Sequence, residues 1–292
     1  MILRMFTDAL LLALVWLSCQ VSAAAPIDID ALMATVRTLA SAEFEGRRTG
    51  TRGGDKAREW VAQRFKSIGL QPLASGTNVV GLCKGTDGGQ NVFVVSAHFD
   101  HLGVQNGHIY FGADDNASGV AVLLAIAEHC KRTPFKHDVV FAAFDAEEQG
   151  LQGARAFVAK PPIPKARLAL NINLDMVARG DKDELYAAGT YHWPHTKPPL
   201  DAVAKRASIK LRFGHDRPSD GKDDWTTHSD HAAFHAAGIP FVYFGVEDHP
   251  DYHKPTDTAD KINPTFFRHS AQTILDAVMA LDQAPAAARA GR

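Results

Sequence analysis

The stretch Val92-Phe-Val-Val-Ser-Ala-His-Phe-Asp100 carries the strongest indication of the fold class. Its first six residues are apolar or small and include three valines, a pattern typical of a strand that is buried on both faces. A histidine and an aspartate follow where this strand ends. Strands of this kind belong to parallel sheets covered by helices, and such sheets bind ligands at the carboxyl ends of their strands.

Three further runs share these properties, because they are short, apolar and rich in β-branched or aromatic residues. They cover residues 139–144, 168–174 and 239–245. Helical patterns alternate with them, most clearly at Val120–His129, which is apolar on most sides. This alternation predicts an α/β protein, a three-layer αβα sandwich with a mostly parallel, mixed central sheet.

The remaining elements follow from apolar spacing and from residues that start or stop helices. We expect helices at 29–39, at 60–68 ending before Gly69, at 200–207, and after the capping pair Asn263-Pro264, with a strand at 209–213. The polar, glycine-rich stretch 45–54 is predicted to be an irregular loop, and the long polar stretch 214–231 a functional loop.

Length and composition indicate a single folded domain, which we place at residues 24–284. The chain has 292 residues, of which 46% are hydrophobic and 22% charged, and its net charge is -2. Lysine and arginine are scattered and balanced by acidic residues, so no basic stripe for nucleic acid is present. Because no dimerisation domain is evident, we expect a monomer, with a frayed tail at 285–292.

Residues 1–23 are interpreted as a cleaved export signal. Arg4 precedes the apolar run Ala9–Leu17, and Val21-Ser-Ala23 offers small residues at a cleavage site. The run is shorter than the ~20 apolar residues that span a bilayer, so a membrane anchor is disfavoured. We therefore expect a periplasmic or secreted protein.

Cleavage after the predicted signal would remove Cys19 and leave two cysteines. Sequence alone leaves open whether Cys83 and Cys130 pair in an oxidising compartment. Two isolated cysteines without CxxC spacing exclude a cysteine-ligated metal site.

Acidic and imidazole side chains recur where the predicted strands end. They are His98 and Asp100 after the first strand, Glu147 and Glu148 after the second, Asp175 after the third and His253 after the fourth, with Asp114 and Asp115 shortly before Ser118 and the 120–129 helix. Carboxylates gathered in one buried place repel one another unless cations neutralise them. Two imidazoles with several carboxylates suit zinc, and a single carboxylate can bridge two metals ~3.5–4 Å apart. The cluster therefore predicts a dinuclear zinc site.

Five blocks of sequence resemble the M28 family of zinc aminopeptidases. These blocks are His98-Phe-Asp100, Gly112-Ala-Asp-Asp-Asn-Ala-Ser-Gly119, Asp145-Ala-Glu-Glu148, Asn173-Leu-Asp-Met176 and Tyr252-His-Lys-Pro-Thr-Asp257. The resemblance implies a zinc exopeptidase-like fold with two Zn²⁺ per chain. It also implies that Asp115 bridges both metals, that His98 and Asp175 complete one site, and that Glu148 and His253 complete the other.

Three further residues are predicted to serve the reaction. Asp100 is expected to orient His98. Glu147 and Glu148 are adjacent, so their side chains diverge, and Glu147 is expected to be the general base that takes a proton from a metal-activated water. Tyr252 matches a position where some relatives place a phenol that stabilises an oxyanion, although plain packing would explain it equally well. The predicted activity is hydrolysis of the N-terminal peptide bond of peptides with a free amino end.

Two enzymatic alternatives use the same fold. One is a glutaminyl cyclase. The resemblance implies that cyclases hold a single zinc and depart from the Asp-Asn-x-Ser-Gly pattern, so the presence of this pattern here favours the peptidase. The other is a carboxypeptidase, which needs a cationic anchor, for which Arg179, Arg212 and Arg217 are candidates.

Two further interpretations are disfavoured. A non-catalytic binding module is the least favoured, because the ligand set is complete. Ser229-Asp230-His231 is rejected as a hydrolase triad, because triad residues meet in space and no G-x-S-x-G elbow exists. The block is expected to shape the pocket or support the metal site. Asp223, Asp224 and Trp225 either line the entrance or lie on a solvated loop face, and the solvated face is favoured.

Overall fold

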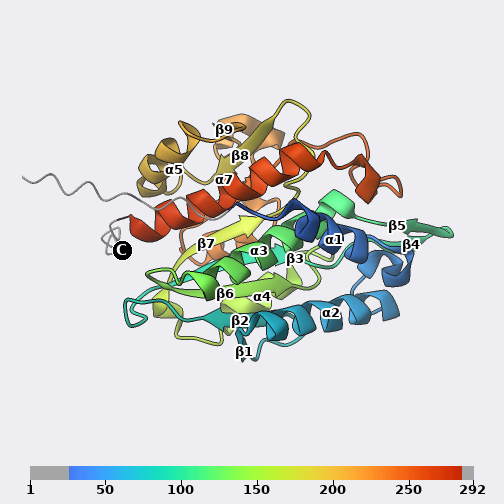
Figure 1. Ribbon diagram of the computed structural model, residues 1–292, viewed down its shortest axis with the longest axis horizontal. Coiled ribbons are helices and arrows are strands. Elements are labelled where there is room, and N and C mark those ends of the chain that lie inside the picture. Colours follow the sequence, from blue (N-terminus) through green and yellow to red (C-terminus); the bar gives the residue numbers. More distant parts are fainter. Residues whose placement is uncertain (1–25, 285–292) are drawn as a thin grey trace, which may run out of the picture.

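The computed structural model describes residues 26–284, so the predicted export signal and the predicted tail lie outside the described residues. Its centre is an eight-stranded sheet in the order β1-β2-β6-β3-β7-β10-β8-β9 (Figure 1). The strands, in that order, are Gln71–Leu73, Val79–Cys83, Asp138–Phe144, Val92–His98, Leu168–Leu174, Phe241–Gly245, Glu184–Ala188 and Lys210–Phe213. A separate ribbon pairs β4 (Gly103–Gln105) with β5 (His108–Tyr110).

The four strands predicted from the sequence form the parallel centre of this sheet. β6, β3, β7 and β10 run parallel to one another, with Val95 of β3 opposite Phe141 of β6 and Ile172 of β7. β2 pairs antiparallel with β6, and β8 antiparallel with β10. The sheet is therefore mixed and mostly parallel at its centre, and the predicted fold class is confirmed.

Helices cover both faces of the sheet. They are α1 (Ile29–Leu39), α2 (Arg52–Ile68), α3 (Gly119–Arg132), α4 (Gln152–Ala159), α5 (Lys197–Ala204), α6 (His231–Ala236) and α7 (Pro264–Gln283). Side chains of α1, α2, α3 and α7 share one core with residues such as Val95 and Ile172, and Figure 1 shows α1, α3 and α7 across this face. Phe157 of α4 and Phe234 of α6 pack with Val94 on the opposite face. Because adjacent strand residues point to opposite faces, Val94 and Val95 belong to different cores.

The predicted helix signals at Gly69 and Asn263 are present in the structure. α2 ends at Gly69, whose φ of 82° is left-handed and suits glycine. The Asn263 side chain accepts hydrogen bonds from the amides of Thr265 and Phe266, and Pro264 occupies the first turn of α7.

The prediction of an irregular loop at 45–54 is partly wrong. A 3₁₀ helix covers Ala42–Arg47, and α2 already begins at Arg52, capped by the Thr51 side chain. A Cβ on Gly53 would lie 2.1 Å from the carbonyl oxygen of Phe44. Gly53 therefore permits close packing of the first turn of α2 against Phe44. The glycine-rich sequence pattern alone predicted a loop at this place.

A disulfide between Cys83 and Cys130 joins β2 to α3, which answers the question that the sequence left open. None of the helices within residues 26–284 is long and apolar enough to cross a membrane.

Candidate metal centre

The predicted ligands meet at the carboxyl ends of the central strands. His98 ends β3, Glu148 follows β6, Asp175 follows β7, and His253 lies in the loop after β10. Asp115 lies in the short helical segment Ala113–Ser118, which leads into α3. The fold thus brings together five residues that are spread over more than half of the chain.

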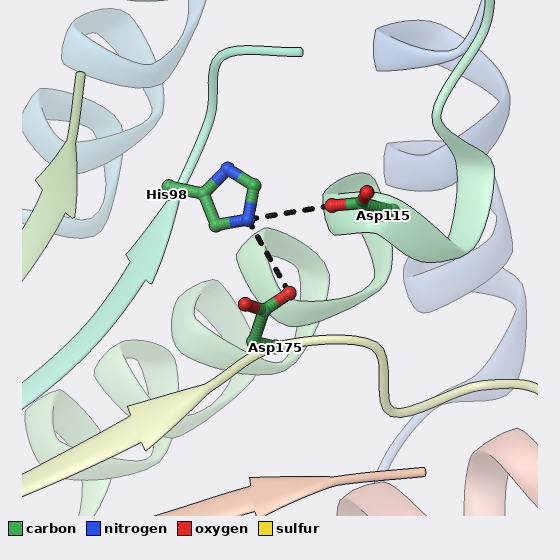
Figure 2. A group of neighbouring side chains, drawn as sticks. All are labelled: His98, Asp115 and Asp175. Atoms are coloured by element: carbon green, nitrogen blue, oxygen red, sulfur yellow. Dashed lines mark hydrogen bonds and ion pairs between the residues drawn. The ribbon is translucent and has the colours of Figure 1, made fainter. Parts of the chain in front are cut away.

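One group of ligands is formed by His98, Asp115 and Asp175 (Figure 2). His98 Nε2 lies 3.4 Å from Asp115 Oδ1 and 3.3 Å from Asp175 Oδ1. On the other side of the ring, Nδ1 donates to the carbonyl oxygen of Asp100 at 3.2 Å. This bond keeps a ring proton on Nδ1, so Nε2 is the nitrogen that could bind a metal between the two carboxylates.

A second group lies on the far side of Asp115. His253 Nε2 is 3.1 Å from Asp115 Oδ2 and 3.3 Å from Glu148 Oε2. Asp115 therefore turns Oδ1 toward His98 and Oδ2 toward His253. This divergence of its two oxygens is the arrangement that a bridging carboxylate requires.

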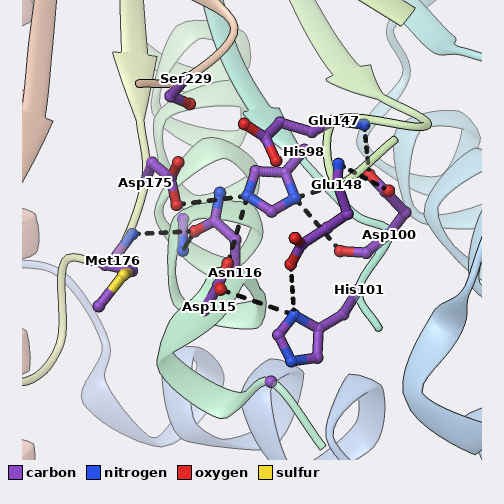
Figure 3. Close-up of polar contacts among 12 residues, drawn as sticks. His98, Asp100, His101, Asp115, Asn116, Glu147, Glu148, Asp175, Met176 and Ser229 are labelled. Atoms are coloured by element: carbon purple, nitrogen blue, oxygen red, sulfur yellow. Dashed lines mark hydrogen bonds and ion pairs between the residues drawn. The ribbon is translucent and has the colours of Figure 1, made fainter. Parts of the chain in front are cut away.

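His101 belongs to this second group, and the sequence analysis did not select it. Its Nδ1 lies 2.8 Å from Glu148 Oε1 and 3.6 Å from Asp115 Oδ2 (Figure 3). His101, Asp115 and Glu148 together place ligand atoms close enough to share one ion. The available signal was its position directly after Asp100 in the segment that follows β3.

The electrostatics of the buried cluster favour the binding of cations. Burial, reinforced by the charges of Asp230, Asp175 and Glu148, raises the pKa of Glu147 to about 10. Burial alone would lower the pKa of His98, but the carboxylates of Asp175 and Glu147 raise it well above its usual value. Protons thus compensate the negative charge in the protein alone, and divalent cations would replace them. The donor set of imidazole nitrogens and carboxylate oxygens fits zinc.

The main chain around Asp115 is held by side chains from distant segments. The Asp257 carboxylate accepts hydrogen bonds from the amides of Asp114 and Asp115 at 3.0–3.2 Å. Asn116, joined to Asp115 by a cis peptide, donates from Nδ2 to the carbonyl of Leu174 at 2.9 Å. These bonds tie the segment that carries Asp115 to the end of β7.

The guanidinium of Arg47 lies fully buried beneath the centre. It donates hydrogen bonds of 2.7–2.8 Å to the carbonyl oxygens of Leu39, Phe99, Phe111 and Gly112. Burial lowers the pKa of Arg47 to about 10, and nearby carboxylates, Asp115 first among them, oppose this shift. The group therefore stays charged at neutral pH and connects the segment after β3 to the segment before Asp115.

Asp100 holds the turn that carries the two glutamates. Its carboxylate accepts from the amide of Glu147 at 3.0 Å and from the amide of Glu148 at 3.3 Å. The same carboxylate is 3.6 Å from His98 Nδ1, whereas the Asp100 carbonyl makes the shorter contact. Figure 3 shows the Glu147 and Glu148 carboxyl groups pointing to different sides of His98.

A cavity of about 660 Å³ opens onto the centre. It is lined by His98, Asp115, Glu147, Glu148, Gly150, Asp175, Met176, Lys222, Asp223, Trp225, His228, Tyr243, Val246, Glu247, Asp248, Tyr252 and His253. Asp223 and Trp225 are among them, so these two residues line the entrance, where Asp223 is exposed and Trp225 is half-buried.

Two tyrosines face this cavity. Tyr252 stacks on His253 with ring centroids 3.9 Å apart, and burial raises the pKa of its phenol, which is therefore protonated at neutral pH. Tyr243, which the sequence analysis did not select, is buried and donates to the Asp175 carbonyl at 3.3 Å.

The three candidate arginine anchors do not line the cavity. Arg179 pairs with Asp251 at 2.8 Å, and Arg212 pairs with Glu184 at 2.8 Å. Arg217 lies over the ring of Tyr191.

Ser229, Asp230 and His231 do not form a catalytic triad. Ser229 Oγ accepts from Asn173 Nδ2 at 2.9 Å, and His231 Nε2 donates to the carbonyl of Trp225 at 2.9 Å. His231 therefore has its Nε2 committed to the main chain and cannot take a proton from Ser229 through it.

Comparison with known proteins gives one family and several relatives. The family model described as "Peptidase family M28" matches residues 78–278. "Aminopeptidase YwaD" of Bacillus subtilis is 29% identical over 202 residues, which are 64% of this chain and 40% of that protein. The chain thus spans about two fifths of the length of this curated relative.

Solved structures share the fold. BSAP, described as a zinc aminopeptidase from Bacillus subtilis, superposes with a TM-score of 0.72 at 18% identity, over 87% of this chain and 95% of that chain. A Bacteroides thetaiotaomicron glutaminyl cyclase superposes with a TM-score of 0.70 at 18% identity, over 88% of this chain and 99% of that chain. The fold is thus common to aminopeptidases and cyclases, and the chemistry must be argued from the site.

Proposed function

Because the chain belongs to peptidase family M28, we propose that it is a zinc-dependent exopeptidase that removes residues from the amino end of peptides. The observation that carries the proposal is the pair of ligand groups that share Asp115. His98 and Asp175 lie next to one oxygen of Asp115, and Glu148 and His253 next to the other. Such an arrangement suits two zinc ions bridged by one carboxylate.

The separations between ligand atoms support this assignment. A tetrahedral ion with ligands at 2.0–2.2 Å holds those ligands about 3.3–3.6 Å apart. His98 Nε2 lies 3.3–3.4 Å from its two carboxylate partners, and His253 Nε2 lies 3.1–3.3 Å from its own. Little rearrangement is needed to admit an ion at either place.

Bound zinc would supply the Lewis acidity that activates water and polarises the scissile carbonyl. Glu147 is proposed as the general base, because its carboxyl faces the cavity beside His98 while its backbone amide is held by Asp100. After taking a proton from the attacking water, Glu147 would pass it to the leaving amine. The protonated phenol of Tyr252, in the same cavity, is placed to donate a hydrogen bond to the developing oxyanion.

The charges at the cavity favour a free amino end over a free carboxyl end. Asp223, Glu247 and Asp248 line it, whereas Lys222 is the one lysine or arginine in that lining among the residues that the structure describes. An acidic mouth attracts the cationic α-amino group of a peptide and repels a terminal carboxylate. The three candidate arginines lie outside the cavity, so none of them can anchor a terminal carboxylate there.

We also propose that the protein is exported and that residues 1–23 direct its export. The Cys83–Cys130 disulfide supports this, because such bonds persist in oxidising compartments.

The test is to assay purified protein on aminoacyl-nitroanilides, on N-blocked peptides and on N-terminal glutaminyl peptides, with metal content measured on the same sample. We expect cleavage of free-amine substrates, no reaction with blocked ones, and two zincs per chain. Cyclisation of glutaminyl peptides with one zinc per chain would replace the proposal with a cyclase. Complete inactivity without retained metal would favour a binding module.

A further inference from the structure

His101 is a buried histidine whose ring nitrogens lack aligned hydrogen-bond partners. Its side chain is fully buried, and neither Nδ1 nor Nε2 makes a hydrogen bond within the described residues. Glu148 Oε1, which lies 2.8 Å from His101 Nδ1, is also buried without one. The two atoms are thus close, but their directions do not suit a hydrogen bond, as is usual for two ligands of the same ion.

The local packing fixes the ring in this position. A Cβ on Gly112 would lie 2.6 Å from Cγ and Cδ2 of His101, so only glycine leaves room for the imidazole here. The ring of His253 meets that of His101 edge to face, with centroids 6.0 Å apart. Both imidazoles therefore approach the same pair of carboxylates from different directions.

The distances around this pair of carboxylates are close to those of a four-ligand ion. His101 Nδ1 lies 2.8 Å from Glu148 Oε1 and 3.6 Å from Asp115 Oδ2, and His253 Nε2 lies 3.3 Å and 3.1 Å from the same two side chains. A tetrahedral zinc site requires separations of about 3.3–3.6 Å, so two of these four distances match it, and the other two would lengthen by a few tenths of an ångström around an ion.

We propose that His101 is a ligand of the second zinc, together with Asp115, Glu148 and His253. The inference rests on the two-metal centre of the proposed function and adds one ligand to it. The second site would then hold two imidazoles and two carboxylates, whereas the site at His98 holds one imidazole and two carboxylates. Because an imidazole is a better zinc ligand than an additional water, the second site should bind the first equivalent of metal.

X-ray absorption of the metal-free full-length protein, reloaded with one equivalent of Zn²⁺, tests this assignment by counting imidazoles. We expect two imidazoles per zinc at one equivalent, and three shared by two zincs at two equivalents. His101→Ala should reduce these counts to one and to two, and His253→Ala should do the same. His129→Ala, at a buried histidine on α3 away from the centre, is the matched control and should leave both counts unchanged.

Zinc affinity, measured by competition with a chelator, separates a ligand from a residue that only orients Glu148. Loss of an outer partner weakens metal binding roughly 10–100-fold. His101→Ala should weaken the first equivalent by more than that, and His101→Gln, which can still donate a hydrogen bond, should not restore it.

One imidazole per zinc in the unchanged protein, or rescue by His101→Gln, would overturn the assignment of His101 while leaving the two-zinc proposal intact. A protein that binds no zinc would overturn both. Because the imidazole count of the unchanged protein is decisive by itself, the test does not depend on the folding of any variant.

Discussion

Replacing Arg47 by methionine should destabilise the protein by about 4 kcal/mol. The fully buried guanidinium donates to four carbonyl oxygens, those of Leu39, Phe99, Phe111 and Gly112. At the lower end of the roughly 1.5–3 kcal/mol that a hydrogen bond from a charged group contributes, four such bonds give about 6–8 kcal/mol. Burial of the charge offsets about 3 kcal/mol of this, because the pKa falls from 12.5 to about 10.

The assay is denaturant unfolding at neutral pH with a chelator present, so that metal binding does not contribute to the free energy of unfolding. Arg47→Lys keeps the charge but reaches fewer carbonyls, so we expect an intermediate loss. Arg48→Met is the matched control, because Arg48 is the exposed neighbour and its loss should cost less than about 0.5 kcal/mol. A loss below about 1 kcal/mol for Arg47→Met would show that the four carbonyls find other partners and that the reasoning is wrong.

Three further predictions concern catalysis, pH and the disulfide. Glu147→Gln should keep the zinc content and the free energy of unfolding but lower kcat by about 10²–10⁴-fold, since Glu147 moves the proton; loss of metal in this variant would contradict the assignment. Burial lowers the pKa of His231 from 6.5 to about 3, so below pH 6.5 the unfolded chain binds a proton that the folded protein does not. As the pH is lowered from 6.5 to 3, this group should therefore reduce the free energy of unfolding by up to about 1.4 kcal/mol per pH unit. In His231→Gln the free energy of unfolding should depend less on pH over this range; curves parallel to those of the unchanged protein would refute this. Replacing both Cys83 and Cys130 by alanine should cost about 4 kcal/mol in denaturant, because the bond closes a loop with a separation of 47 residues; a cost below 1 kcal/mol would show that the unfolded chain gains little freedom.

The centre of the fold could be predicted because its strands are buried on both faces. β3 and β6 are buried at every residue and β7 at all but one, and their short runs, rich in β-branched and apolar residues, favour central strands over helices. Of the outer strands, β9 (Lys210–Phe213) was predicted at 209–213, whereas β8 and β2 were missed for the corresponding reason. β8 (Glu184–Ala188) alternates buried and half-buried residues over a short length, and β2 (Val79–Cys83) contains Gly81, which weakens any strand signal.

The proposed ligands could be selected because most of them carry a titratable group after a central strand, where the carboxyl edge of a parallel sheet gathers them, while Asp115 lies in the segment before α3. His101 has the same kind of side chain and lies three residues after His98, yet the sequence does not indicate which of two neighbouring imidazoles turns toward the carboxylates. That choice depends on the course of the chain after β3. It also depends on the space that Gly112 leaves beside the ring.

The groups that hold the centre together act mainly on the main chain, which is why the sequence does not reveal them. Arg47 binds carbonyl oxygens, the Asp100 carboxylate binds the amides of Glu147 and Glu148, and the Asp257 carboxylate binds the amide of Asp115. The position of a ligand side chain depends on how firmly its backbone is held, because the side chain rotates about bonds that start at its Cα. It follows that the separations within the two ligand groups depend on residues that act mainly through the main chain, so changes at these positions should alter metal affinity even though every ligand remains.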